Sequence, residues 1–213
     1  MKPILFNTEM VRAILEGRKT VTRRVVKPEQ NTSLKVKDEG IAEFLNNVRF
    51  KNGMTPEEML EAYYTAPYKV NDVLYVRETW REIIRPVGTP KEFDYKADRD
   101  TRALGLFKWK PSIHMPKEAA RIFLRVTAVR VEQLHDITNE QILAEGIDKK
   151  QIENSLSQMP EPVDEWERAC YAFEWANLWD STVKDKNHSW GGNPFVWVIE
   201  FEDISEDIKN GRL

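Results

Sequence analysis

The sequence predicts an α+β protein in which a mixed β-sheet or small β-barrel is surrounded by helices. Three observations support this fold class: segments with strand-like alternation lie far apart in the chain, helical patterns are few, and the two kinds do not alternate regularly. A regular alternation would instead indicate a parallel sheet built from strand–helix–strand units. Because 213 residues suffice for one sizeable core, we expect a single domain.

The chain opens with a predicted strand, helix and strand. Residues 4–6 form a short apolar run, and Asn7 and Thr8 are residue types that cap helices. Apolar residues then recur at helical spacing up to Gly17, which can adopt the left-handed conformation that ends a helix. Residues 19–26 are rich in β-branched side chains, so we expect a strand that ends before a proline.

The middle of the chain contains segments with less regular patterns. Residues 27–66 are mixed and include a short predicted helix at 56–64, whereas residues 72–80 are expected to form a strand. Residues 81–110 carry several prolines and glycines among many charges, which indicates a long excursion with little regular structure. Its length suits either a lid or binding loop, or a connection without a function of its own.

The second half of the chain predicts two more strands and two helices. Residues 122–131 and 195–201 alternate as strands do. Thr138 is followed three positions later by Gln141, a capping-box pattern, and the helix that begins there is expected to end at Gly146. A longer amphipathic helix is expected to bury an apolar stripe made of Trp166, Ala169, Cys170, Phe173 and Ala176.

Composition and charge narrow the classes of function. Hydrophobic residues make up 41% of the chain, yet it has no apolar run of the roughly 18 residues that a membrane helix needs, and its N-terminus becomes polar too soon for a signal peptide. The net charge of −3 argues against a long basic track along a polyanion but leaves room for a small basic pocket. The single cysteine, Cys170, fits a reducing compartment, so we expect a cytoplasmic protein without a membrane partner.

Residue types that commonly bind metals are scattered along the chain. His114, His135, Cys170 and His188 do not have the spacing of metal ligands. The sequence also lacks a glycine-rich phosphate loop, a zinc deaminase signature and a Ser-His-Asp pattern. We therefore expect neither a metal nor an organic cofactor.

The segment after Gly17 holds the first candidate site. Lys19 follows a glycine turn and stands at the start of a predicted strand. Because side chains alternate along a strand, Thr22 and Arg24 lie on one face and Arg23 on the other. A lysine, a hydroxyl and a guanidinium in one place could bind an anion or activate the hydroxyl, and a nearby arginine would lower the pKa of the lysine. The alternative is a solvated basic edge strand whose charges discourage aggregation.

Two glutamates stand out by their positions. Glu145 lies in the last turn of a predicted helix, where the helix dipole disfavours a carboxylate, so it is either a proton donor in a site or an exposed side chain of little consequence. Glu78 shares a face with apolar residues of the strand at 72–80. It is therefore either an inward carboxylate that pairs with the arginines at 23–24 and braces the site, or a residue beyond the point where the strand leaves the core.

Aromatic and loop residues are candidates for binding a base. Seven tryptophans could provide stacking surfaces, although in a chain of this size they more often form a large core. Trp190 and Asn193 lie in a glycine-containing loop before the last strand, and His114 lies between two prolines, where it could line a pocket or be a hydrogen-bonded structural residue. The stacking candidates are Trp80, Trp109, Trp190 and Trp197.

Taken together, these motifs resemble the ASCH domain family of the PUA-like superfamily, especially its phage and prophage-encoded members. The resemblance covers well under two-thirds of the chain. It rests on the order of five segments, at residues 14–24, 72–80, 111–134, 137–147 and 193–202. The chain is thus expected to be one ASCH domain over residues 1–213, with insertions at about 27–66, 81–110 and 148–189.

This resemblance implies a small β-barrel with a helix-lined cleft and an association with RNA or a modified nucleoside. The similar bacterial proteins are 4-acetylcytidine amidohydrolases, which use a lysine as general base, a threonine as nucleophile and a glutamate as proton donor. Matched by motif, these roles fall on Lys19, Thr22 and Glu145, and Arg24 would stabilise an oxyanion. The alternatives are a non-catalytic RNA-binding module and, less well supported, a ribonuclease.

Overall fold

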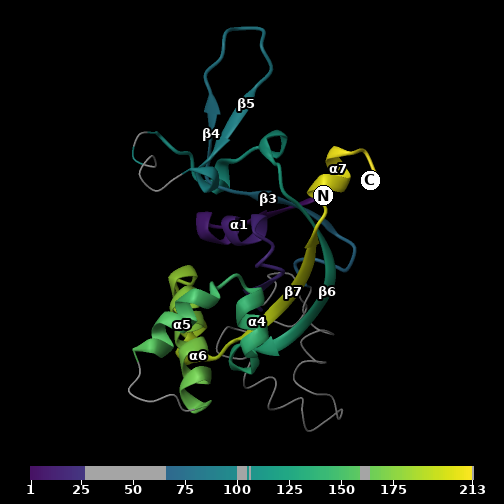
Figure 1. Ribbon diagram of the computed structural model, residues 1–213. Coiled ribbons are helices and arrows are strands. Elements are labelled where there is room, and N and C mark those ends of the chain that lie inside the picture. The colour runs from purple at the N-terminus through teal and green to yellow at the C-terminus, as the bar shows by residue number, and fades with distance from the viewer. Residues whose placement is uncertain (27–65, 100–104, 106, 159–163, 213) are drawn as a thin grey trace.

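The computed structural model describes residues 1–26, 66–99, 105, 107–158 and 164–212 (Figure 1). The predicted helix at 56–64 and nearly all of the expected insertion at 27–66 lie outside the described residues. No helix in the described ranges is long and apolar enough to cross a membrane.

The main structural unit is a five-stranded sheet with strand order β1-β3-β6-β7-β2. β1 and β3 are parallel, and every other neighbouring pair is antiparallel. The fold is therefore α+β, as predicted, but the sheet is open and β1 does not pair with β2, so the expected closed barrel is wrong. The strands are β1 (Lys2–Leu5), β2 (Val21–Val25), β3 (Val73–Arg77), β6 (Phe123–Gln133) and β7 (Phe195–Asp203).

The opening strand, helix and strand form largely as the sequence predicts. The side chain of Asn7 caps α1 (Thr8–Leu15) by accepting a hydrogen bond from the backbone N–H of Met10 at 2.8 Å. Gly17 then adopts a φ of 73°, which returns the chain toward β2. The turn at Gly17 is what brings the start of β2 next to the helix.

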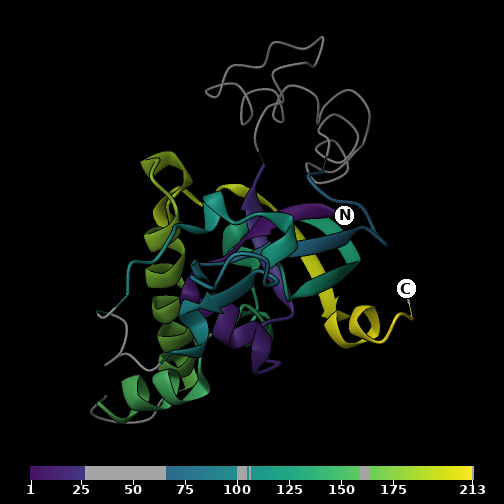
Figure 2. The same cartoon turned by 90° about the horizontal axis from the view of Figure 1, so that it is seen from above.

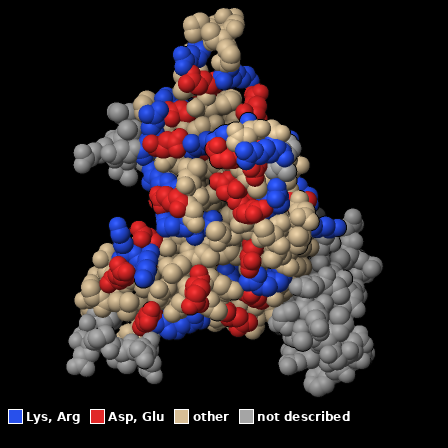
Figure 3. Space-filling model, turned by 45° about the vertical axis from the view of Figure 1, so that its right-hand side comes forward, with Lys and Arg blue, Asp and Glu red and all other residues tan. Residues whose placement is uncertain are grey.

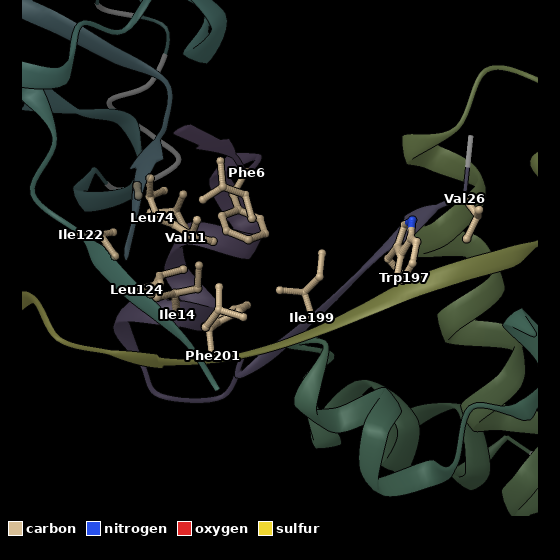
Figure 4. Close-up of a cluster of buried hydrophobic side chains, with 14 of the residues drawn as sticks. Phe6, Val11, Ile14, Val26, Leu74, Ile122, Leu124, Trp197, Ile199 and Phe201 are labelled. Atoms are coloured by element: carbon tan, nitrogen blue, oxygen red, sulfur yellow. The ribbon is translucent and has the colours of Figure 1, made fainter. Parts of the chain in front are cut away.

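Two apolar clusters pack on the two faces of β7. Phe195, Trp197, Ile199 and Phe201 contribute to the cluster beneath α1, whereas Val196 and Val198 contribute to a second cluster beneath the later helices. β7 is apolar on both faces because it is covered on both sides. Figure 4 shows the first cluster, in which Phe6, Val11, Ile14, Leu74, Leu124 and Phe201 gather between α1 and the sheet.

The capping box at Thr138 forms as predicted. Thr138 and Gln141 bond each other's backbone N–H groups at the start of α4 (Asn139–Ala144), and Glu145 is the C-terminal cap. Gly146 follows with a φ of 101°. The remaining helices among the described residues are α5 (Lys149–Ser157), α6 (Asp164–Thr182), α7 (Ser205–Lys209) and the 3-10 turns at Lys96–Asp98, Ser112–His114, Lys117–Ala119, Leu134–Asp136, Lys186–His188 and Trp190–Gly192.

The apolar stripe expected on α6 is largely wrong. Cys170 is buried as predicted, but Trp166 and Phe173 are 42% and 61% exposed. The rest of the buried side of the helix consists of Tyr171, Trp175 and Trp179. The buried side faces the second cluster, so contacts with α4, α5 and the sheet select it. Both stripes are aromatic and apolar, and helical spacing alone does not distinguish them.

The strand expected at 72–80 and the loop expected at 81–110 are also corrected. β3 ends at Arg77, and the chain turns at Glu78 before β4 (Trp80–Ile83) pairs antiparallel with β5 (Glu92–Tyr95). This two-stranded hairpin projects from one end of the protein, while α4, α5 and α6 lie at the other end (Figure 1). Figure 2 shows α6 and α7 on opposite sides of the molecule.

Gly146 provides a test of the fold around the start of β2. A Cβ at Gly146 would lie 2.8 Å from the Cβ of Ala13 and 3.1 Å from the Cβ of Lys19, in addition to the backbone strain of its positive φ. We expect Gly146→Ala to lower the free energy of unfolding by about 2–4 kcal/mol, since overpacking and strain both contribute. Urea denaturation followed by tryptophan fluorescence measures the loss.

Gly17→Ala is the matched control for this prediction. Its φ of 73° is also left-handed, but nothing lies within 4 Å of the added Cβ. We expect a loss of about 1 kcal/mol from the backbone conformation alone. Equal losses in the two variants would contradict the close packing of Gly146 against Ala13 and Lys19.

Candidate functional site

Lys19 and Glu145 meet in a completely buried ion pair, although they are 126 positions apart in the chain. The Lys19 Nζ lies 2.6 Å from the Glu145 Oε2, and the two side chains are 0% and 1% exposed. Backbone pairing aligns them, because Lys19 and Glu145 form an isolated antiparallel bridge and the Thr20 N–H donates to the Ala144 carbonyl at 2.9 Å. The end of α4 is thereby joined to the start of β2.

The Lys19 ammonium has a complete set of acceptors. Besides the carboxylate of Glu145, it donates to the backbone carbonyls of Glu145 and Val21, each at 2.8 Å. The ring of Phe6 covers it, with the centroid 5.6 Å from the Nζ. Burial lowers the pKa of Lys19 despite the opposing attraction of Glu145. The nearby guanidinium groups of Arg24 and Arg23 lower it further, as the sequence predicts.

Arg23 is a site residue that the sequence analysis missed. Its NH1 donates to the Glu145 Oε1 at 3.1 Å, and its NH2 donates to Gln141 at 2.8 Å and to Glu132 at 3.1 Å. Glu145 is therefore held by two cations, one on each carboxylate oxygen. The strand alternation that separates Arg23 from Thr22 places Arg23 on the same side as Lys19, and this was the signal that could have identified it.

Thr22 and Arg24 form a second pair beside the ion pair. The NH1 of Arg24 donates to the Thr22 Oγ1 at 2.7 Å and to the Arg23 carbonyl at 2.9 Å, and its NH2 donates to the Leu5 carbonyl at 3.2 Å. Thr22 is buried, and burial lowers the pKa of Arg24. No hydrogen bond joins Thr22 to Lys19 in the part of the chain that the structure describes.

A cleft of about 1110 Å³ runs along this edge of the sheet. Thr22, Arg23, Arg24 and Glu145 contribute to its lining, whereas Lys19 lies behind it. The opposing lining comes from the C-terminal end of α6 and the residues that follow it. The burial of these side chains rules out the alternative of a solvated basic edge strand, because Lys19, Thr22 and Arg23 are all removed from water.

Two buried donors beside the cleft have no hydrogen-bond acceptor among the described residues. They are the Arg23 Nε and the Trp175 Nε1, and both residues contribute to the cleft lining. Trp175 and Trp179 are lining residues that the sequence analysis did not identify as site candidates.

Glu78 is an inward carboxylate, but its expected partner is wrong. It is buried and forms a two-point ion pair with Arg121, from Nε to Oε1 at 2.9 Å and from NH2 to Oε2 at 3.1 Å. Burial raises the pKa of Glu78 although Arg121 opposes this shift. The pair braces the turn between β3 and β4, and Glu78 does not contact the arginines of β2.

The structure does not bring the other predicted residues to the cleft. Trp80 is buried against Phe93 in a separate small cluster, and His114 is exposed. Trp190 packs on the ring of His135, with 4.1 Å between the ring centroids. The Asn193 Oδ1 accepts a hydrogen bond from the backbone N–H of His135 at 2.8 Å. Neither Trp190 nor Asn193 lines the cleft.

Of the four tryptophans proposed as stacking surfaces, Trp197 is the one found in the cleft lining. No described residue between 81 and 110 lines the cleft, so the expectation of a lid in that segment receives no support from the described residues.

Groups of three or more His, Cys, Asp or Glu side chains that could hold a metal ion do not occur within the described ranges.

Comparisons with protein-family models, with curated proteins and with solved structures find no match to this chain. The site is therefore interpreted from its own geometry and from the motif resemblance.

Glu145→Gln tests the ion pair. The substitution preserves shape but leaves Lys19 and Arg23 as buried cations without their shared carboxylate. We expect a loss of about 3–5 kcal/mol in the free energy of unfolding, as for other broken buried pairs. Urea denaturation measures it, and Glu167→Gln on the exposed side of α6 is the control, for which a change within about 0.5 kcal/mol is expected. A loss as small as that of the control would contradict the pair.

The lowered pKa of Lys19 predicts a pH dependence of stability. In the unfolded chain this pKa has its ordinary value of 10.5, so between the folded value and 10.5 the unfolded chain binds one proton more. Stability attributable to Lys19 therefore rises with pH across this window. We expect Lys19→Met to remove this rise when urea denaturation is repeated at alkaline pH values below 10.5, whereas Lys186→Met should leave it intact. Parallel pH profiles for the wild type and Lys19→Met would contradict the lowered pKa.

Proposed function

We propose that this protein is an ASCH-type, PUA-like protein of the cytoplasm that recognises a nucleoside or RNA in the cleft at β2 and hydrolyses the amide of an acylated cytidine. The observation that carries the proposal is the placement of a hydroxyl, a guanidinium and a buried lysine–carboxylate pair at one cleft. Thr22, Arg24 and Glu145 line that cleft, and Lys19, which lies behind the lining, contacts the Glu145 carboxylate at 2.6 Å.

The ion pair supplies both a base and an acid without gaining or losing a proton. Transfer of one proton across the 2.6 Å contact converts the ammonium and carboxylate into a neutral amine and a carboxylic acid. Burial lowers the pKa of Lys19, which is the direction that a general base requires. The amine is then a general base, and the carboxylic acid of Glu145 is a proton donor.

Acyl transfer to Thr22 is the first chemical step. The Thr22 hydroxyl loses its proton to the Lys19 amine, and its oxygen attacks the amide carbonyl carbon. Arg24, which already donates to the Thr22 Oγ1 at 2.7 Å, stabilises the negative charge that develops on the carbonyl oxygen. Glu145 protonates the departing amine of cytidine, which leaves an ester on Thr22 and restores the ammonium–carboxylate pair.

Water completes the reaction by hydrolysing the ester. The water loses a proton to the base of the pair, its oxygen attacks the ester carbonyl, and the Thr22 oxygen regains a proton as it leaves. The overall reaction consumes one amide and one water and releases one amine and one carboxylic acid. Arg23 positions Glu145 throughout, since it holds the carboxylate oxygen that Lys19 does not bond.

A non-catalytic binding module is the second candidate function, and one observation favours it. The three donors of Lys19 are all engaged, with Glu145 and with two backbone carbonyls, and none of them reaches Thr22. In this arrangement the cleft could bind a base or an RNA end without reacting. Chromatography of acylated cytidine after incubation, together with an RNA-binding titration, separates the two functions.

Thr22→Ala tests the catalytic role. We expect the release of cytidine from 4-acetylcytidine to fall by a factor on the order of 10³ or more, because the nucleophile is lost. Thr22→Ser keeps a hydroxyl and should retain activity. Liquid chromatography of released cytidine measures the rate, and circular dichroism checks that each variant folds.

Thr20→Ala is the matched control, since Thr20 is exposed and does not line the cleft. Its rate should equal that of the wild type. Turnover by Thr22→Ala at the wild-type rate would remove Thr22 from the mechanism. RNA binding by a wild type that releases no cytidine would instead favour the binding module.

A further inference from the structure

The wall of the cleft opposite β2 carries charged groups that the proposed reaction does not use. Lys184, Asp185 and His188 follow α6 and contribute to the cleft lining. These residues lie within the predicted insertion at 148–189, for which the motif resemblance makes no statement. Their purpose must therefore be inferred from the structure around them.

The segment that carries these groups is held in place by a set of specific bonds. The Trp179 Nε1 donates to the His188 carbonyl at 2.8 Å, and the Trp190 N–H donates to the Asp180 Oδ1 at 2.7 Å. The Asn187 N–H donates to the Asp185 Oδ1 at 3.0 Å. The two ends and the middle of the segment are thus fixed, so it presents Lys184 and His188 on a defined backbone.

The backbone at Gly192 packs closely against the backbone of the segment that precedes it. A Cβ at Gly192 would lie 2.3 Å from the Asn187 carbonyl oxygen, so the backbone that follows the segment packs directly on it. Such close backbone approach requires glycine. These hydrogen bonds and this close packing hold the segment in place as part of the cleft wall.

The charges at the cleft do not balance. Lys19 and Arg23 are matched by the carboxylates of Glu145 and Glu132. Arg24, by contrast, donates to neutral oxygens, and Lys184 forms no ion pair with any residue that the structure describes.

The one remaining carboxylate in the lining, Asp185, lies 3.7 Å from the His188 Nδ1. Among the lining residues, the three cations Arg23, Arg24 and Lys184 exceed the two carboxylates of Glu145 and Asp185 by one charge, in a chain whose net charge is −3. On the face shown in Figure 3, acidic and basic side chains are interspersed. An unmatched cation in the lining of a cleft favours an anionic ligand.

The cleft is also large for a nucleoside. Its volume of about 1110 Å³ exceeds the roughly 300–1,000 Å³ that is usual for pockets that hold small ligands. Thr22 lies in the wall formed by β2 and Lys184 in the opposing wall, so a ligand that fills the cleft can contact both. A phosphate is the group that adds both length and negative charge to a nucleoside.

We propose that the ligand of this cleft is a phosphorylated nucleoside, whose phosphate binds Lys184 and His188 while its base lies beside Thr22 and Arg24. The proposal rests on the proposed function, because it names the substrate class of the same site. The phosphate can belong to a free nucleotide or to the end of an RNA chain, and both present the same chemistry to Lys184.

A binding experiment with matched ligands tests this proposal. Isothermal titration of the wild-type protein with cytidine, cytidine 5′-monophosphate and a 5′-phosphorylated oligocytidine compares ligands with and without a phosphate. We expect the monophosphate to bind on the order of tenfold more tightly than cytidine, as one charge-assisted contact provides. If the oligocytidine binds more tightly than the monophosphate, the bound phosphate belongs to the end of an RNA chain. If the two ligands bind equally tightly, it belongs to a free nucleotide.

Lys184→Gln should abolish this preference and leave the affinity for cytidine unchanged. Lys186→Gln is the control, because Lys186 belongs to the same segment but does not line the cleft. Both lysines are exposed, so neither substitution should disturb folding.

The outcomes separate this proposal from the proposed function. Equal affinity of the wild type for cytidine and its monophosphate would overturn the phosphate site and leave the nucleoside site intact. A preference that survives in Lys184→Gln would overturn the assignment to this segment. Binding of none of the three ligands, together with no release of cytidine from 4-acetylcytidine, would overturn both.

Discussion

The buried ion pair between Lys19 and Glu145 is the constraint on which the rest of the site depends. Removing two charges from water costs several kcal/mol for each ion, and mutual attraction offsets this only when both groups are fully bonded. The protein meets that condition, since the ammonium has three acceptors and Arg23 bonds the second carboxylate oxygen. Such a pair adds little net stability but restricts geometry strongly, because displacing either partner leaves an unpaired buried charge.

The same constraint explains why the cleft lies at an edge of the sheet. β2 is an edge strand, so the side that does not face β7 is available to side chains, and Lys19 bonds the Val21 carbonyl there. Arg24 spans from β2 to the Leu5 carbonyl at the end of β1. Side chains, rather than a backbone ladder, therefore connect the two edges of the open sheet. A cleft forms where a closed barrel would have continued its hydrogen bonds.

Several features of the fold were predictable because they depend on a few neighbouring residues. The cap at Asn7, the capping box at Thr138 and the turn at Gly17 all follow from local backbone chemistry. The residue types of the site were recognisable for a similar reason, because Lys19, Thr22 and Arg24 follow a glycine turn in one short segment and Glu145 stands where the helix dipole disfavours a carboxylate. The exposed stripe of α6 shows the limit of this reasoning, since two apolar faces compete and only packing against the sheet selects one.

By itself, the sequence determined the α+β class, most strand and helix positions, and the identities of Lys19, Thr22, Arg24 and Glu145 as notable residues. Only the tertiary structure decided that Lys19 meets Glu145, that Arg23 joins them and that Glu78 pairs with Arg121 instead. The physical reason is that ion pairing has no local periodicity. With 32 basic and 35 acidic residues in the chain, each charge has many chemically equivalent partners. The folded backbone alone selects among them, by bringing segments more than a hundred positions apart within hydrogen-bond distance.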